Sequence, residues 1–296
     1  LKDLQHIVYH NSDKGGIDLN YFCRFPELII LSVGTCKLTE QKELPLCFQN
    51  LKTIRLSGQC AKFRWPDYFL YDGVFSAIDQ LVVFDGATAS FNRTLPYFHN
   101  SSKLKELELL KLGLIGKLAP EYDVLLRDLI LLDLSYNKLE GKIPSWKFNR
   151  LEALRLKRNL LVGEIPKSIF GGTLEKIDLS QNANIAGTLP PLQKNYSSLR
   201  CLDIRGTGVN GFGSSGNNAS VRKDYMSRVN ITLLPWQPNF AAVLAFHEGC
   251  TICNATNCSS SSEEYSEIYL QCVNMKTSWE FDKFCSIEPS IVNLIT

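Results

Sequence analysis

Leucines alternate with other residues in a recurring pattern along the middle of the chain. In 129–144 the order Leu-x-x-Leu-x-Leu is followed by Asn137, Leu139 and Gly141, and 151–166 repeats this skeleton at identical offsets, 22 residues later. In Leu-x-Leu both leucines point to one side of an extended chain. A fixed period of about 20–29 residues is typical of a solenoid whose repeats pack on their neighbours. The pattern therefore predicts short parallel strands with a continuous leucine core.

The same template fits at further points and sets the domain organisation. Successive starts differ by 22 to 27 residues, so the connecting segments vary in length. We expect eight or nine repeats in residues 1–212, and in 213–296 a linker and a cysteine-rich region that caps the last repeat. The template matches well at Leu104, Leu129, Leu151, Leu174 and Leu199, and in fewer positions at Leu28, Leu51 and Ile78. Leu1 with Leu4 is the candidate for a ninth repeat.

An asparagine follows several of the predicted strands and is expected to turn inward. Its amide can there satisfy backbone groups of its own and neighbouring turns. The Gly and Pro that come next should end the extended run and turn the chain toward the convex side. Asn137, Asn159 and Asn182 hold the inward position, Cys36 and Thr207 stand in for it, and Leu112 and Gly86 interrupt it.

These residues resemble the leucine-rich-repeat family, in particular its plant-type subclass with Leu-x-Gly-x-Ile-Pro. The resemblance is specific for 104–211 and looser back to Leu28. It implies an α/β solenoid, a right-handed superhelix with a parallel sheet on the concave face, here with a disulfide-rich C-terminal cap. Two short segments, 187–191 and 206–211, also look like repeats of kinetoplastid surface antigens.

The ten cysteines lie mainly in two terminal groups. Cys23 and Cys47 precede successive repeats at similar offsets, and Cys36 and Cys60 follow the opening leucines of those repeats. Because neighbouring strands are about 4.8 Å apart, we predict the disulfides Cys23–Cys47 and Cys36–Cys60, with free core cysteines as the alternative.

The C-terminal cysteines allow two interpretations. The Cys-x-x-Cys pair beside His247 has a spacing that suits zinc. Glycosylation sequons inside the cluster favour an oxidised loop instead, and Cys201 is the natural partner for the odd cysteine. The predicted disulfide set is Cys201, Cys250, Cys253, Cys258, Cys272 and Cys285, with its pairing open.

Sequons place the chain in the secretory pathway. With 20 asparagines, chance predicts roughly two or three Asn-x-Ser/Thr sites, and the chain has seven. Together with the cysteines they predict an extracellular or cell-surface protein. The start at Leu1 suggests a processed or truncated piece whose signal peptide and any membrane anchor lie outside it. The sequons are Asn92, Asn100, Asn195, Asn218, Asn230, Asn254 and Asn257.

Charge and motifs argue against several functions. The net charge of +2 gives no pull toward nucleic acid. The four histidines are scattered, and no phosphate loop, HExxH or nucleophile motif is present. We therefore expect neither an enzyme nor a cofactor.

Residues that flank the Leu-x-Leu leucines should face a partner on the concave side. A basic patch with an adjacent tyrosine stands out, because Tyr and Arg are enriched at binding hot spots. Acidic residues at matching positions in three repeats leave a solvated ion-pair ladder as the alternative. The candidate partner-binding residues are Tyr136, Arg155, Lys157, Arg158, Lys176, Asp133, Asp178 and Arg205.

Three functions fit this arrangement. The first is an extracellular recognition or adhesion module that binds a protein, peptide or glycan through its concave face. The second is a structural component of an extracellular coat, sheath or filament. The third is an inhibitor of a secreted hydrolase.

Overall fold

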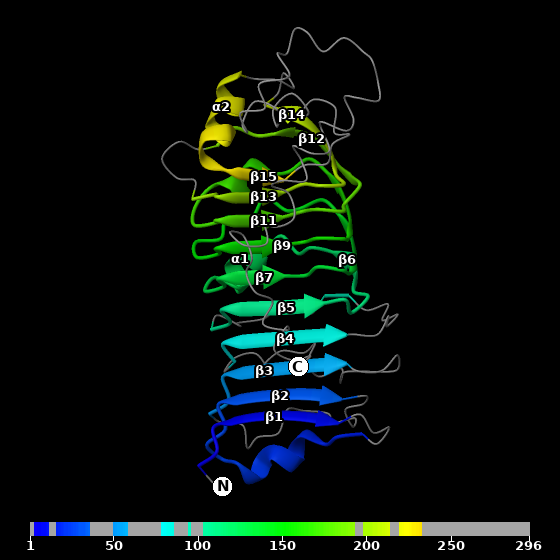
Figure 1. The fold of residues 1–296 in the computed structure, drawn as a ribbon, viewed down its shortest axis with the longest axis vertical. Coiled ribbons are helices and arrows are strands. Elements are labelled where there is room, and N and C mark those ends of the chain that lie inside the picture. The colour runs from blue at the N-terminus through cyan, green and yellow to red at the C-terminus, as the bar shows by residue number, and fades with distance from the viewer. Residues whose placement is uncertain are drawn as a thin grey trace, which may run out of the picture.

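The computed structural model describes residues 3–11, 16–35, 50–58, 78–85, 94–95, 103–192, 198–213 and 219–232. Within these ranges the chain winds into a solenoid whose main layer is a ten-stranded parallel sheet (Figure 1). Each strand pairs with those of the adjacent repeats. The strands, in spatial order, are β1 (His6–Asn11), β2 (Ile30–Thr35), β3 (Thr53–Gly58), β4 (Gln80–Asp85), β5 (Glu106–Leu110), β7 (Leu131–Asp133), β9 (Ala153–Arg155), β11 (Lys176–Asp178), β13 (Cys201–Asp203) and β15 (Asn230–Thr232).

The repeat pattern places these strands correctly. In this sheet, each strand from β2 to β13 begins two residues after a predicted opening residue, as β7 does after Leu129 and β9 after Leu151. β1 begins at His6, two residues after Leu4, so that Leu4 takes the place of the opening residue and the strand lies three residues later than a repeat opening at Leu1 would place it. The opening residues of β2 to β13 and the Leu-x-Leu residues resolved there are buried in one continuous core. Alternation in Leu-x-Leu therefore separates a core side from a concave side, as expected.

A second sheet lies where we expected only a turn toward the convex side. It contains β6 (Ile115–Lys117), β8 (Lys138–Gly141), β10 (Leu160–Gly163), β12 (Asn184–Leu189) and β14 (Gly208–Phe212), in the order β14-β12-β10-β8-β6. The glycine of Leu-x-Gly is the last residue of β8 and of β10, as expected, whereas β12 continues two residues past Gly187. Gly141, Gly163 and Gly187 have φ of 79°, 84° and 91°, values that glycine adopts without steric cost.

Helical structure in the connections is short. Among the described residues it consists of η1 (Leu19–Arg24), α1 (Tyr122–Leu125) and η3 (Lys167–Phe170). An aromatic cluster fills the core beside α1, where Trp146 stacks on Tyr122 with ring centroids 6.2 Å apart. The indole of Trp146 donates to the carbonyl of Ala119 at 2.9 Å, so this buried polar atom is satisfied.

Two elements lie inside 213–296, the segment predicted to be a linker and cap. They are α2 (Ala219–Arg228) and β15, which pairs with β13 and so extends the long sheet by one strand. Tyr225 of α2 is buried against Phe170 and Phe212, and its hydroxyl donates to the carbonyl of Pro190 at 2.8 Å. This ring anchors α2 on the preceding repeats. The division into two domains at residue 212 stays a prediction.

Candidate binding surface

Each strand of the central repeats ends in the same turn, and this turn positions the exposed side chains. The residue before the inward asparagine has a left-handed backbone in Tyr136, Arg158 and Gln181, with φ of 61°, 53° and 59°. The equivalent residue of the next repeat is Gly206, with φ of 69°. Such a backbone costs a residue with a side chain roughly 1–2 kcal/mol, so the surrounding structure must hold it.

The inward asparagines supply that support. Asn159 donates to the carbonyls of Leu134 and Leu156, both at 3.0 Å, and accepts from the backbone N–H of Leu139 at 3.0 Å. These bonds join its own turn to the preceding repeat. Asn182 bonds the next pair of repeats in the same way, donating to the carbonyl of Leu156 at 2.9 Å. The predicted role of these amides is confirmed by the hydrogen bonds.

The repeats that lack the asparagine show two solutions. Leu112 is buried, and Asn137 of the following repeat accepts from the backbone N–H groups of Leu112 and Leu114 at 3.0 and 3.1 Å. Thr207 takes the inward place with its hydroxyl, which donates to the carbonyl of Ile204 at 2.7 Å. Cys36 and Gly86 lie outside the described residues.

Three candidate residues meet at the strand ends, and we call Tyr136, Lys157 and Arg158 the strand-end surface. The Nζ of Lys157 lies 5.8 Å and the Cζ of Arg158 5.7 Å from the centre of the Tyr136 ring. These distances are within the range of cation–π attraction. Tyr136 is 38% exposed, and Arg158 is exposed as well. The three side chains thus form a cationic surface around an accessible aromatic ring.

Three other candidates, Asp133, Arg155 and Asp178, are the last residues of β7, β9 and β11. Together with Glu108 of β5 and Asp203, the last residue of β13, they form what we call the charged row. Neighbours in this row are register partners on β5, β7, β9, β11 and β13. Three of them share a local role. The carboxylates of Asp133, Asp178 and Asp203 accept from the backbone N–H two residues later, at 2.9, 2.9 and 3.0 Å.

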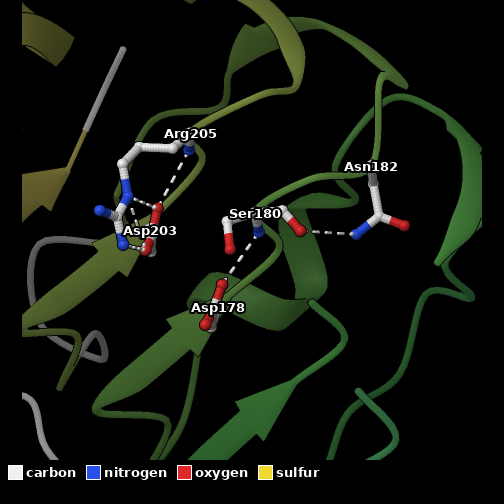
Figure 2. A network of polar contacts seen from close by, with 5 residues as sticks. All are labelled: Asp178, Ser180, Asn182, Asp203 and Arg205. Atoms are coloured by element: carbon white, nitrogen blue, oxygen red, sulfur yellow. Dashed lines mark hydrogen bonds and ion pairs between the residues drawn. The ribbon is translucent and has the colours of Figure 1, made fainter. Parts of the chain in front are cut away.

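Arg155 of the row and Arg205, which follows β13, are engaged in ion pairs. Arg155 lies 3.1 Å from Asp133 across the strand pair, with only 15% and 2% of the two side chains exposed. Arg205 turns back on Asp203, and its Nε lies 3.0 Å from Oδ1 (Figure 2). Arg155, Asp133 and Arg205 therefore hold turns and strands together. Lys176 is at the opposite end of its strand from the strand-end surface.

Asp178 differs from the other carboxylates of the row. Burial raises the pKa of its carboxyl, and the negative charge of the neighbouring Asp203 raises it further. Hydrogen bonds from the side chain and backbone of Ser180 and the charge of Lys157 lower this pKa, but by less. No salt bridge between described residues involves Asp178.

Leu160 is an exposed apolar residue that the sequence analysis did not predict. It follows Arg158 of the strand-end surface by two positions in the chain. Leu160, at the start of β10, is 56% exposed, whereas Leu161 is buried. The sequence could have predicted this exposure. Only Leu161 matches the buried leucine of the repeat skeleton, so the adjacent Leu160 falls at a position that faces solvent.

The predicted modification sites are mostly outside the described ranges. Cys23 and Cys201 are each disulfide-bonded, whereas the other eight cysteines lie outside the described residues, so the proposed pairings stay predictions. Of the sequons only Asn230 is described, at the start of β15 in register with Cys201. Asn92, Asn100, Asn195, Asn218, Asn254 and Asn257 are outside.

Neither a metal site nor a membrane-spanning helix occurs in the described ranges. No group of three or more His, Cys, Asp or Glu residues there is arranged to hold a metal ion. The helices within those ranges are also too short or too polar to cross a bilayer.

Comparisons with known proteins agree with the repeat pattern. A family model described as Leucine Rich Repeat matches residues 128–148. Receptor-like protein 53 of Arabidopsis thaliana is 30% identical over 185 residues, which are 58% of this chain and 18% of the relative. Receptor-like protein 18 of the same plant is 29% identical over 202 residues, 61% of this chain and 24% of the relative. The chain thus spans less than a quarter of the length of these relatives.

A solved structure shows the same fold. The crystal structure of a TDR receptor aligns with a TM-score of 0.51 and 21% identity, over 78% of this chain and 47% of that chain. At this identity the match concerns the solenoid architecture alone.

Proposed function

Because the chain is a leucine-rich-repeat protein, we propose that it is an extracellular recognition module that binds an acidic protein or peptide at its strand-end surface. The observation that carries the proposal is the position of Tyr136 between two cations on the solvent side of the solenoid. Tyrosine and arginine are the residue types that dominate binding energy at protein interfaces.

The turn geometry makes this surface ready for a partner. The backbone of Tyr136 donates to the carbonyl of Lys157 at 2.8 Å, and that of Arg158 donates to Ser180 at 2.8 Å. Both backbones are therefore fixed before any partner arrives. A surface that is already ordered loses less conformational entropy on binding.

The charge of the surface favours an acidic partner. Lys157 and Arg158 both lie close to the same ring, and the carboxylates of Asp133 and Asp203 are buried and paired with Arg155 and Arg205. A partner that offers carboxylates beside an apolar or aromatic group would satisfy both features. The names of the two Arabidopsis relatives, receptor-like proteins, favour the same class of function.

Two features support an extracellular location. Cys23 and Cys201 are disulfide-bonded, and disulfides persist in oxidising compartments. The seven sequons have the same implication if they are glycosylated. A cell-surface position is therefore part of the proposal.

A displayed library of random peptides, screened beside a glycan array, would test the proposal. We expect the purified chain to enrich peptides rich in Asp and Glu, and Arg158→Glu to weaken their binding at least about tenfold, the effect of losing roughly 1.4 kcal/mol. Tyr136→Ala should weaken it as well. Lys147→Glu is the matched control, because Lys147 is exposed but lies away from the strand ends.

Three outcomes would contradict the proposal. They are enrichment that is insensitive to Arg158→Glu and Tyr136→Ala, binding to glycans alone, and self-association as the only interaction detected. The last would favour the structural-component alternative.

A further inference from the structure

Cys201 lies on the concave face of the long sheet and is disulfide-bonded. Its neighbour Leu202 is buried in the solenoid core, so alternation along β13 puts Cys201 on the opposite side. Lys176 of β11 and Asn230 of β15 are its register partners. The position of this bond on the sheet decides which cysteines can take part in it.

Distance excludes every cysteine of the N-terminal group. β13 lies seven strands from β2 and six from β3 in the sheet, which at about 4.8 Å per strand is roughly 34 and 29 Å. Cys23 lies in η1, which precedes β2, and Cys36 comes directly after β2. Cys60 follows the end of β3 by two residues, and can extend from it by only about 7 Å.

Cys47 is excluded for the same reason. It precedes Thr53, the first residue of β3, by six residues, and can therefore extend from there by about 20 Å at most, which leaves roughly 9 Å of the distance to β13. A disulfide requires two Cα atoms within about 7 Å of each other. None of the four N-terminal cysteines can approach Cys201 so closely.

The remaining five cysteines all follow β15, the strand that pairs directly with β13. We propose that Cys201 is bonded to one of them, and that this bond holds the C-terminal segment, residues 233–296, against the concave face at β11 and β13. The candidates for the bond are Cys250, Cys253, Cys258, Cys272 and Cys285.

Charge complementarity favours the same contact. Residues 233–296 contain seven acidic and two basic residues, a net charge of −5, whereas residues 1–232 contain 23 acidic and 30 basic residues, a net charge of +7. Attraction between the two parts adds to the covalent link. Lys176, directly opposite Cys201 in the register, is one cation that the segment would meet.

The C-terminal segment is thus a permanent intramolecular partner of one part of the concave face. The strand-end surface is separate from it, because Tyr136 follows β7, three strands from β13. This inference does not depend on the proposed function, and each can fail without the other.

Peptide mapping of the intact, unreduced protein by mass spectrometry tests the bond. We expect the peptide that contains Cys201 to be linked to a peptide from 250–285. A free Cys201 thiol, or a link from Cys201 to any of Cys23, Cys36, Cys47 and Cys60, would overturn the proposal. This measurement uses the unmodified chain and does not depend on the folding of a variant.

Lysine labelling tests the contact. In Cys201→Ser, a water-soluble acylating reagent should modify Lys176 several-fold faster than in the parent protein, because the segment no longer covers it. Labelling of Lys138 on β8 should be unchanged, and Cys23→Ser, at the other end of the solenoid, should leave Lys176 unaffected. An unchanged rate at Lys176 in Cys201→Ser would show that the disulfide does not hold the segment over this face.

Discussion

Arg155 donates to Asp133 across one strand pair, at 3.1 Å, and the two residues are register partners 22 positions apart. Only 2% of the Asp133 side chain and 15% of the Arg155 side chain are exposed. The pair therefore links consecutive repeats.

We expect Arg155→Ala to lower the free energy of unfolding by about 3 kcal/mol, because it leaves the buried carboxylate of Asp133 without its counter-charge. Denaturant titration followed by circular dichroism measures this. Arg150→Ala is a matched control, since Arg150 and Asp128 lie 3.2 Å apart but are 65% and 33% exposed, and exposed pairs contribute about 0–1 kcal/mol. Equal losses in the two variants would contradict this account.

Asn159→Ala should cost about 2–3 kcal/mol of stability, because it removes a buried amide that bonds two carbonyls and one N–H group and leaves them unsatisfied. Asn184→Ala on the exposed part of β12 should have little effect. Thermal unfolding of both variants beside the parent protein provides the comparison. A small change for Asn159→Ala would show that water can replace the amide.

Gly187→Ala should destabilise the second sheet by about 1–2 kcal/mol, since its φ of 91° is unfavourable for alanine. The new Cβ would also lie 2.9 Å from the Cγ of Glu164. Combining the change with Glu164→Ala separates these causes. In the double variant the contact with Glu164 is gone but the backbone cost of the positive φ remains. A double-mutant cycle should therefore still show part of the loss in the free energy of unfolding. Full recovery in the double variant would mean that the backbone cost is negligible.

Asp178→Asn tests the electrostatics of the charged row. Burial and the charge of Asp203 raise the pKa of Asp178, so the folded protein binds a proton here more readily than the unfolded chain. The contribution of this carboxyl to stability is present below its unfolded pKa and is lost as pH rises through the raised folded pKa.

The asparagine keeps an acceptor for the Ser180 N–H and cannot ionise. We therefore expect Asp178→Asn to be more stable than the parent protein at neutral pH, with a difference that shrinks as the pH falls toward about 4, the ordinary aspartate range. Melting temperatures across this range provide the measurement. A difference that is constant with pH would contradict the assigned cause.

The long sheet was predictable because its signal is a strict alternation. The opening leucines, such as Leu129 and Leu151, are buried on one side by period-two geometry, and this fixes the strand positions. The second sheet was not predicted, since its strands are short and the repeat pattern marks only one buried leucine in each, such as Leu139 of β8 and Leu161 of β10. Without an alternation of buried positions, a pairing of these segments could not be recognised.

The candidate surface was predicted only in part. Tyr136, Lys157 and Arg158 meet because their positions relative to the strand end are set by the repeat. Arg155 and Arg205 are arginines like Arg158, but each forms an ion pair with an aspartate. Whether an arginine does so depends on side-chain packing that the repeat pattern does not specify. Residue identity alone therefore did not distinguish surface cations from structural ones.

The hydrogen bonds made by Asn137, Asn159 and Asn182 also determine the order in which the repeats of the solenoid unfold. They join consecutive central turns, so loss of one turn strips hydrogen bonds from the next. Unfolding should begin at the outer repeats and stop at this central section, where amide hydrogen exchange would be slowest. Tyr136 and Arg158 lie within it, so the strand-end surface would remain formed while the ends of the solenoid fray.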